Sequence, residues 1–337
     1  MKKILIVKIG AIGDVVMALP LIKDIRDREP EAHITWLCGK QVLPLLERVE
    51  GIDRLMVVDE KRLLNQGLLN RILAILHIWK QLAFKSFDLR LYFYRSPLYQ
   101  ILTLPGLFRE TRGFRDRKTG SRLPVQGRHH SVEYIRAWRG MGGPDEITPE
   151  YPVYQRNPDA ASQKTIPGKR IVLACGGARN ILQNNDLRRW PLENYRLLAE
   201  KIHGIGCEIV LTGAPGDAWV RDGFSSIPHT DLIGKLSLNE FIDYLSGSTL
   251  LITHDSGPLH LADLAGCPVL GLFGPTRPAD FRSLNPASAF IWGGEHLSCR
   301  PCYDGKDYGS CQSNECLKSI SAEQVFLKFQ EMLSHSE

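Results

Sequence analysis

One carboxylate near the start of the chain has a setting suited to proton transfer. Asp14 ends the segment Lys8-Ile-Gly-Ala-Ile-Gly-Asp14, in which two glycines follow an apolar run that predicts a strand. A glycine turn between a strand and a helix lets a ligand approach the backbone closely, and Asp14 is the titratable group presented there. It is therefore a candidate general base. The alternative is that Asp14 only caps the helix, where an Asp contributes about 1 kcal/mol.

Further turns of this kind lie in the second half of the chain. The segment His254-Asp-Ser-Gly-Pro-Leu-His260 follows a predicted strand, and backbone amides at such a helix start can bind a pyrophosphate. The segments ending at Thr276 and Asp217 add two more turns to the same edge, and the Asp217 carboxylate suits a ribose hydroxyl. His260 lies one turn into the helix, where it either adds a hydrogen-bond donor or packs, as most single histidines do.

Strands must alternate with helices to position these turns. The pattern predicts strands at 3–9, 33–38, 54–59 and 87–94 with helices at 14–28, 41–49 and 64–84. It then predicts strands at 170–175, 208–213, 231–233, 250–253 and 268–273 with helices at 192–203, 217–224, 238–246 and 259–265. Polar, Pro- and Gly-containing stretches at 142–149 and 157–169 predict the hinge between two α/β domains. The glycine spacing is not G-x-G-x-x-G and no acidic residue ends the second strand, which argues against a nicotinamide dehydrogenase.

Composition and charge narrow the functional classes. The 337 residues are 43% apolar and 23% charged, which is ordinary for a globular protein of two domains. No apolar leader follows Met1-Lys2-Lys3, so we expect a cytoplasmic protein. Between 85 and 139 twelve Lys or Arg face four Asp or Glu. This stretch predicts a loop-rich basic surface for phosphate or carboxylate groups, or simply a solvated face, and no nucleic-acid module accompanies it.

The most apolar stretch is 68–84, which three basic or histidine side chains interrupt. It is too charged for a membrane span and predicts an amphipathic helix. We expect this helix to pack on its sheet, and a helix lying on a membrane surface is the alternative.

Four of the eight cysteines form a cluster near the end of the chain, Cys299-x2-Cys302-x8-Cys311-x4-Cys316. In a cytoplasmic protein this set fits a structural Zn or Fe ion better than disulfides, with free or paired thiols as the alternative. Such a site would fix the conformation of the loop before the last helix or support the assembly of several copies of the chain. The other four, Cys38, Cys175, Cys207 and Cys267, lie in or beside predicted strands and suit the core.

Together the motifs resemble glycosyltransferase family 9, the ADP-heptose:lipopolysaccharide heptosyltransferases and their relatives. The resemblance spans nearly the whole chain. It rests on four segments in this order: Gly10-Ala-Ile-Gly-Asp14 with Ala18-Leu-Pro20, Arg188-Arg-Trp-Pro-Leu-Glu-Asn-Tyr195, Asp255-Ser-Gly-Pro-Leu-His-Leu-Ala262, and Phe273-Gly-Pro-Thr276. Some relatives carry a similar four-cysteine site.

The resemblance implies the GT-B architecture, in which two Rossmann-like domains with parallel sheets face an interdomain cleft. By this resemblance, residues 1–155 bind the acceptor, and residues 156–320, which include the cysteine cluster at 299–316, bind the nucleotide sugar. Residues 321–337 form a helix that returns to the first domain, and Ser321 and Gln324 fit a capping box at its start.

The resemblance also implies roles for single residues. Asp14 deprotonates an acceptor hydroxyl, which displaces the nucleotide diphosphate from the sugar with inversion and without a catalytic metal. Donor contacts are expected from Arg179, Asn180, Arg188, Asp217, Lys235, Leu236, Asp255, Ser256, Gly257, His260 and Thr276. Acceptor contacts are expected from Lys8, Gly10, Gly13, Arg95, Arg112, Arg115, Arg117 and Lys118. Arg188 stands where the family usually has the Lys of a Lys-x-Trp-Pro pattern, which keeps the charge but changes its reach.

The expected activity is transfer of a heptose from ADP-heptose to a phosphorylated core oligosaccharide or lipid-linked acceptor, with peripheral contact at the cytoplasmic face of the inner membrane. Three alternatives stay open: another sugar nucleotide, a protein acceptor, and a nucleotide-sugar-binding protein that has lost turnover. Retention of Asp14 argues against the last, because a protein that only binds needs no base there.

Overall fold

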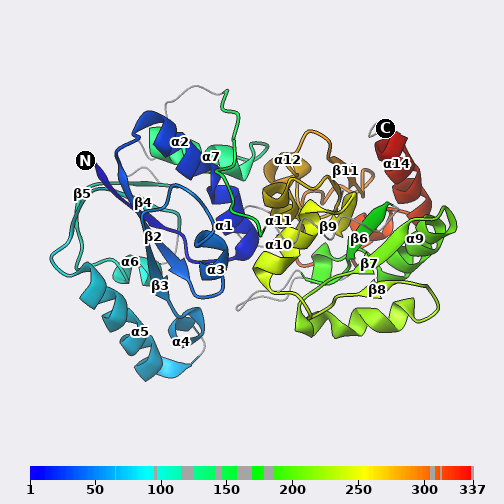
Figure 1. The fold of residues 1–337 in the computed structure, drawn as a ribbon, viewed down its shortest axis with the longest axis horizontal. Helices are drawn as coiled ribbons and strands as arrows, with labels where there is room; N and C mark the ends of the chain where they lie inside the picture. The colour runs from blue at the N-terminus through cyan, green and yellow to red at the C-terminus, as the bar shows by residue number, and fades with distance from the viewer. Residues whose placement is uncertain are drawn as a thin grey trace. The chain divides into compact units, whose positions relative to one another are not determined.

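The chain divides into two compact units, Met1–Gln155 and Arg156–Glu337, each an α/β layer structure with one parallel sheet (Figure 1). The computed structural model describes residues 1–64, 66–94, 97–114, 124–140, 146–157, 169–177, 186–303, 308–311 and 313–334. Each unit has its own buried apolar core.

The first unit is built on five parallel strands in the order β3-β2-β1-β4-β5. The strands are β1 (Lys3–Val7), β2 (His33–Gly39), β3 (Arg54–Val58), β4 (Ser86–Tyr92) and β5 (Leu107–Gly113), and the helices are α1 (Ile12–Ala18), α2 (Pro20–Arg28), α3 (Leu43–Leu46), α4 (Glu60–Leu64), α5 (Gly67–Leu82), α6 (Pro97–Ile101) and α7 (His130–Arg139). The order reverses at β1, which lies between β2 and β4. A switch point of this kind is where open α/β sheets bind ligands, and β1 leads directly into Asp14.

Proline explains one difference from the predicted helix at 14–28. The structure has two helices there, and the second begins at Pro20. Pro20 has no N–H to continue the first helix, but it suits the first turn of a new one. The result keeps α1 short, with Asp14 in its first turn.

Two elements fall within the basic stretch that was expected to be rich in loops. The structure forms β5 and α7 there, so Arg109 and Arg112 lie on a strand. β5 is an edge strand whose side chains are mostly exposed, and its charged composition hid it from pattern reasoning. Residues 115–123 of this stretch lie outside the described residues.

The second unit repeats the plan with six parallel strands in the order β11-β10-β9-β6-β7-β8. The strands are β6 (Arg170–Ala174), β7 (Glu208–Leu211), β8 (Thr230–Asp231), β9 (Leu250–His254), β10 (Val269–Phe273) and β11 (Ala289–Trp292), and the helical segments are η2 (Asp186–Arg188), α9 (Leu192–Gly204), η3 (Pro215–Phe224), α10 (Leu238–Ser246), α11 (Gly257–Ala265), α12 (Pro278–Phe281), α13 (Glu315–Lys318) and α14 (Ala322–Ser334). The central strands β6, β9 and β10 are fully buried, as expected for a sheet covered on both faces.

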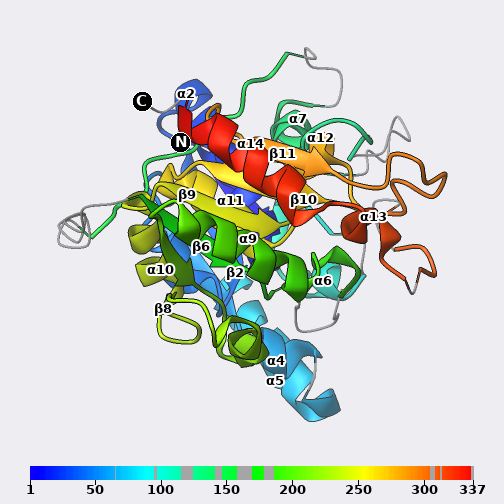
Figure 2. The same ribbon diagram turned by 90° about the vertical axis from the view of Figure 1, so that its right-hand side faces the viewer.

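The last helix, α14, packs against α9 and contributes Val325 and Phe329 to the core of the second unit (Figure 2). The predicted capping box is confirmed: Gln324 N–H donates to Ser321 Oγ at 3.1 Å, and Ser321 N–H donates to Gln324 Oε1 at 2.9 Å. The association of this helix with the first domain stays a prediction.

Candidate functional site

In the first unit, the site is centred on an ion pair at the carboxyl end of β1. Lys8 Nζ donates to Asp14 Oδ2 at 2.8 Å. Lys8 is buried, and burial alone would lower its pKa, but the Asp14 carboxylate and the Tyr134 hydroxyl outweigh burial and raise it. Asp14 is partly exposed. Since Ala11 is the cap residue of α1, Asp14 does not serve as the N-cap. The arrangement is an oriented, partly exposed carboxylate at the edge of the sheet, which suits a general base.

A tyrosine that the sequence analysis missed fixes the glycine turn. The Tyr94 hydroxyl, just past the end of β4, accepts hydrogen bonds from Ile9 N–H at 2.6 Å and Gly10 N–H at 3.1 Å, and donates to Gly10 O at 3.0 Å. Its ring also lies 4.9 Å from Lys8 Nζ. Burial raises the pKa of Tyr94 well above its usual value, so the phenol keeps the proton that it donates. The turn before Asp14 is therefore held by one side chain from a neighbouring strand.

Glu60 is a second missed residue at this edge. It begins α4 directly after β3, and its carboxylate occupies the space where a Cβ on Gly39 would lie, 1.8 Å from Oε1. A larger residue at position 39 would displace the Glu60 carboxylate. Burial raises the pKa of Glu60, and a Cβ on Gly10 would lie 3.5 Å from the same oxygen. The signal available in the sequence was its place at the end of a predicted strand, where ligand-binding side chains gather.

The other predicted acceptor residues are placed unequally. Gly13 lies in the first turn of α1 beside Asp14. The Arg112 guanidinium is engaged within the unit, because it donates to the Glu110 carboxylate and to Trp138 O. Arg95, Arg115, Arg117 and Lys118 lie outside the described residues. A role in acceptor binding stays a prediction for all of these residues.

In the second unit, the ends of β9 and β10 come together as predicted. Thr276 Oγ1 donates to Asp255 Oδ2 at 2.8 Å. Ser256 is the extended N-cap residue of α11, and its hydroxyl donates to His254 O instead of capping the helix. A Cβ on Gly257, the first helical residue, would meet no atom within 4 Å. Among the described residues, nothing therefore crowds the side-chain direction of Gly257, and the amides of this helix start are of the kind that bind an anion such as a diphosphate.

Arg188 brings a cation to this edge. Its Nη1 lies 3.6 Å from Asp255 Oδ2, and its guanidinium lies 5.8 Å from the ring centroid of Tyr308. Tyr308 belongs to the cysteine-rich segment, which packs on the β10 turn because Cys302 N–H donates to Pro275 O. Burial, together with the charges of Arg188 and Arg189, lowers the pKa of His254 to about 3, so this buried imidazole stays neutral.

Asp217 holds two turns of the same edge together. Its Oδ1 accepts from Gly177 N–H at 3.0 Å and its Oδ2 from Ala214 N–H at 2.9 Å. A Cβ on Gly176 would lie 2.3 Å from the Asp217 carboxyl carbon, so the close approach requires glycine there. This is a structural role, and the expected contact with a ribose stays a prediction.

The remaining predicted donor residues lie around this edge. Lys235 and Leu236 belong to the turn after β8, where Lys235 Nζ donates to Asp231 O and Leu236 is half-buried. His260 is buried in α11. Arg179 and Asn180 lie outside the described residues. Donor binding by these residues stays a prediction.

The two groups of cysteines differ as predicted in their burial. Cys38, Cys175, Cys207 and Cys267 are buried, and Cys299, Cys302, Cys311 and Cys316 are not. Burial raises the pKa of Cys302 and of Cys316, and each thiol is close enough to Cys311 to interact with it electrostatically. Within the described part of the chain, however, no three metal-ligating side chains gather around one point. These thiols do not form a closed ligand cage in the structure.

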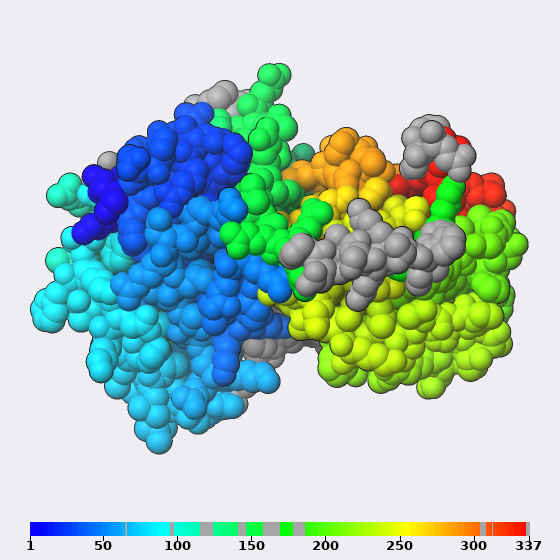
Figure 3. All heavy atoms as spheres, viewed as in Figure 1, coloured from blue at the N-terminus to red at the C-terminus, as the bar shows by residue number. Residues whose placement is uncertain are grey.

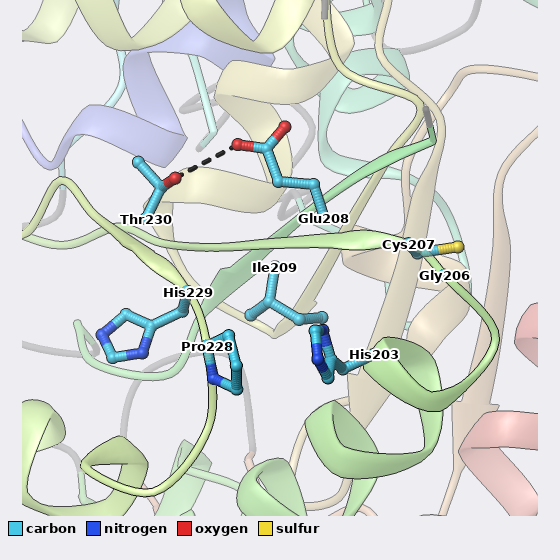
Figure 4. A pocket seen from close by; sticks show the side chains of 8 residues that line it. All are labelled: His203, Gly206, Cys207, Glu208, Ile209, Pro228, His229 and Thr230. Carbon is cyan, nitrogen blue, oxygen red and sulfur yellow. Dashed lines mark hydrogen bonds between the residues drawn. The ribbon is translucent and has the colours of Figure 1, made fainter. Parts of the chain in front are cut away.

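A shallow pocket of the second unit lies elsewhere. It is lined by His203, Gly206, Cys207, Glu208, Ile209, Pro228, His229 and Thr230 (Figure 4). These residues precede or begin β7 and β8, and Thr230 Oγ1 donates to Glu208 Oε1 across its wall. Because the strands are parallel, the pocket is at the amino-end edge of the sheet, opposite to Asp255 and Thr276. It plays no part in the candidate site.

Two doubly wound parallel sheets in separate units, each with charged residues at the carboxyl ends of its strands, form the architecture of the GT-B glycosyltransferases. The family described as glycosyltransferase family 9 (heptosyltransferase) matches residues 121–311, more than half of the chain. The chain belongs to this family, and it is a glycosyltransferase.

Individual relatives agree with this assignment. The lipopolysaccharide core heptosyltransferase OpsX of Haemophilus influenzae is 24% identical over 301 residues, which cover 84% of this chain and 83% of OpsX. A family 9 glycosyltransferase from Veillonella parvula has the same fold, with a TM-score of 0.78 at 22% identity, covering 99% of this chain and 97% of that one. The ADP-heptose LPS heptosyltransferase II of E. coli gives a TM-score of 0.75 at 18% identity, covering 100% and 99%.

The described residues include no helix with both the length and the apolar character needed to cross a bilayer.

Proposed function

We propose that this glycosyltransferase moves a heptose from ADP-heptose to a hydroxyl of a lipopolysaccharide core or related lipid-linked acceptor, at the cytoplasmic face of the inner membrane. The sugar, nucleotide and acceptor are those named for similar proteins, OpsX and heptosyltransferase II. The observation that carries the proposal is the Asp14 carboxylate, held by its bond to Lys8 and partly exposed at the end of β1.

The proposed reaction is a single displacement. Asp14 takes the proton of the acceptor hydroxyl, whose oxygen forms a bond to the anomeric carbon of the heptose. The bond from that carbon to the diphosphate oxygen breaks, its electron pair leaves with ADP, and the anomeric configuration inverts. Lys8 orients the carboxylate and keeps it ionised before the proton arrives. No covalent sugar–enzyme intermediate forms.

Charge on the departing diphosphate requires stabilisation, which we assign to the second unit. The open N-terminus of α11 directs backbone amides and a partial positive charge at an anion. Arg188 adds a full positive charge beside Asp255. Together these groups can serve the purpose that a divalent metal serves in other transferases, so we propose a metal-independent mechanism.

We further propose that Cys299, Cys302, Cys311 and Cys316 hold a structural Zn or Fe ion. Four thiols are the donor set that such ions prefer, and Cys302, Cys311 and Cys316 already lie within electrostatic reach of one another. Binding would draw the thiols together from the positions seen in the structure. The ion would hold the segment that carries Tyr308 and takes no part in the transfer step.

The function is tested with nucleotide binding and the Asp14→Asn substitution. We expect ADP and ADP-heptose to raise the melting temperature more than other nucleotides and their sugars, because a ligand that binds only the folded state stabilises it. Asp14→Asn keeps this shift but lowers acceptor-dependent ADP release about 10²–10⁴-fold, the usual contribution of a general base. Asp27→Asn is the matched control, since Asp27 is an exposed residue paired with Lys23 on α2.

Other results would contradict the proposal in distinct ways. Full turnover by Asp14→Asn would remove Asp14 as the base. If another nucleotide raised the melting temperature and ADP did not, the donor would be a sugar carried by that other nucleotide. Tight binding of ADP-heptose without ADP release, in the presence of acceptor, would indicate a binding protein.

A further inference from the structure

Helix α5 of the first unit has two apolar faces, and the protein covers one of them. Ala74, Ile78 and Leu82 point into the core of the unit. The opposite side is exposed, and the helix itself lies at the lower left of the view in Figure 3. We call this side the α5 surface; it consists of Leu68, Leu69, Ile72, Leu73 and Leu76, with exposed fractions of 72%, 71%, 43%, 49% and 48%. The spacing places these five side chains along one side of the helix.

More apolar side chains extend the α5 surface at the C-terminal end of the helix. Phe84, two residues after α5, is 98% exposed. Leu107 is also exposed, and its N–H donates to Lys85 O, which ties it to the same end. Single exposed apolar residues are ordinary on protein surfaces, but a continuous group of them marks a binding surface.

The charge around this surface has one sign. Residues 61–85 contain five Lys or Arg and no Asp or Glu. Lys80 follows the apolar residues along the same side of α5, where it is exposed, and it forms no ion pair with any described residue. Of the nearest acids in sequence, Glu60 is buried, Asp59 pairs with Arg62, and Asp88 pairs with Arg109. An apolar surface with a cationic rim complements a bilayer that contains anionic lipids.

We propose that the α5 surface docks on an anionic membrane, with its leucines inserted at the headgroup boundary and Lys80 and its neighbours on lipid phosphates. A second copy of the chain fits less well. A two-fold contact through α5 would bring the same cations together, with no acid in residues 61–85 to pair with them. Docking would hold the first unit beside a lipid-linked acceptor, and this last point alone rests on the proposed function.

The test uses the full chain and vesicles of two compositions, phosphatidylcholine alone and phosphatidylcholine with a quarter of phosphatidylglycerol. We expect flotation with the anionic vesicles. The double variant L69Q/L73Q removes two exposed leucines while keeping a good helix former, and we expect its partition coefficient to fall about tenfold for each leucine. Lys80→Gln lowers binding about fivefold on anionic vesicles and leaves binding to neutral ones unchanged. Leu327→Gln, an exposed leucine on α14, is the matched control and binds as the wild type does.

Three results would overturn the proposal. The wild type fails to bind anionic vesicles, the double variant binds as well as the wild type, or sedimentation shows a dimer that L69Q/L73Q converts to a monomer. ADP release with an acceptor freed of its lipid is measured in parallel, and L69Q/L73Q is expected to keep it. If no variant releases ADP but flotation still depends on the α5 surface, the proposed function fails and the docking surface stands.

Discussion

Removal of a single hydroxyl tests whether the turn before Asp14 must be held rigidly. Tyr94→Phe deletes the oxygen that accepts from Ile9 and Gly10 N–H and donates to Gly10 O. The ring is kept, with its stacking on Tyr99 at 4.1 Å and its contact with Lys8. The substitution therefore removes hydrogen bonds without opening a large cavity in the packing.

The expected loss of stability follows from those three bonds. A neutral hydrogen bond contributes about 1 kcal/mol net, and a buried group left without a partner costs about 1–3 kcal/mol. Because Ile9 is buried, its N–H has poor access to water. We expect Tyr94→Phe to lower the free energy of unfolding of the first unit by about 3 kcal/mol, or roughly 9 °C for a unit of this size.

We expect Tyr94→Phe to lose more activity than its lower stability alone would explain. The turn connects Lys8 to Asp14, so a looser turn displaces the carboxylate, and a displacement of about 1 Å can cost about 100-fold in rate. We expect kcat for ADP release to fall about 10–100-fold at a temperature where the variant is fully folded. The donor KM stays within about twofold, because the donor groups belong to the second unit.

Tyr244→Phe is the matched control, since the Tyr244 ring packs on Arg170 and its hydroxyl makes no hydrogen bond within the described residues. A folded Tyr94→Phe variant with unchanged kcat would show that the hydroxyl serves stability alone. A raised donor KM with unchanged kcat would contradict the assignment of acceptor and donor groups to different units.

Three further predictions concern the second unit. Tyr308→Leu removes the ring beside Arg188 and is expected to weaken ADP binding about fivefold in calorimetry, the equivalent of about 1 kcal/mol, whereas Tyr308→Phe binds ADP normally. Equal affinities of the two variants would exclude a contribution of the ring to ADP binding. Between about pH 6.5 and 3 the unfolded state protonates His254 and the folded state does not, so the free energy of unfolding falls by about 1.4 kcal/mol per pH unit as the pH drops. Urea titrations of His254→Asn are expected to lose this slope. An equal slope in both proteins would assign the pH dependence to other groups. The purified protein is expected to contain about one Zn or Fe ion per chain by mass spectrometry, and Cys302→Ser is expected to lose the metal and several degrees of melting temperature. A metal-free wild type of normal stability would contradict the proposed metal site.

The parts of the site predicted from the sequence are those encoded by short segments. A glycine turn after a buried strand places Asp14 and Asp255 at carboxyl ends whatever the order of the strands, because every strand in these sheets is parallel. Pro258 marks the start of α11 in the same way.

The residues that were missed depend on strand order and register. Tyr94 reaches Gly10 because β4 lies beside β1, although 84 positions separate the two residues in the chain. Glu60 reaches Gly39 because β3 lies beside β2. Tyr308 reaches Arg188 through a segment that has no regular pattern. Local patterns carry no information about such neighbours.

Each unit pairs a carboxylate with a cation, and the two pairs expose opposite partners. In the first pair the Lys8 side chain is 4% exposed and Asp14 43% exposed, so the unit presents the carboxylate. In the second pair Asp255 is 5% exposed and Arg188 20% exposed, so the unit presents the cation. A buried cation that orients an exposed carboxylate suits removal of a proton from an acceptor. A buried carboxylate that orients a partly buried but accessible guanidinium suits neutralisation of a diphosphate. The same pair of charges thus presents a carboxylate in one unit and a guanidinium in the other, because burial determines which partner is available to a ligand; the proposed base and the proposed anion site follow this difference.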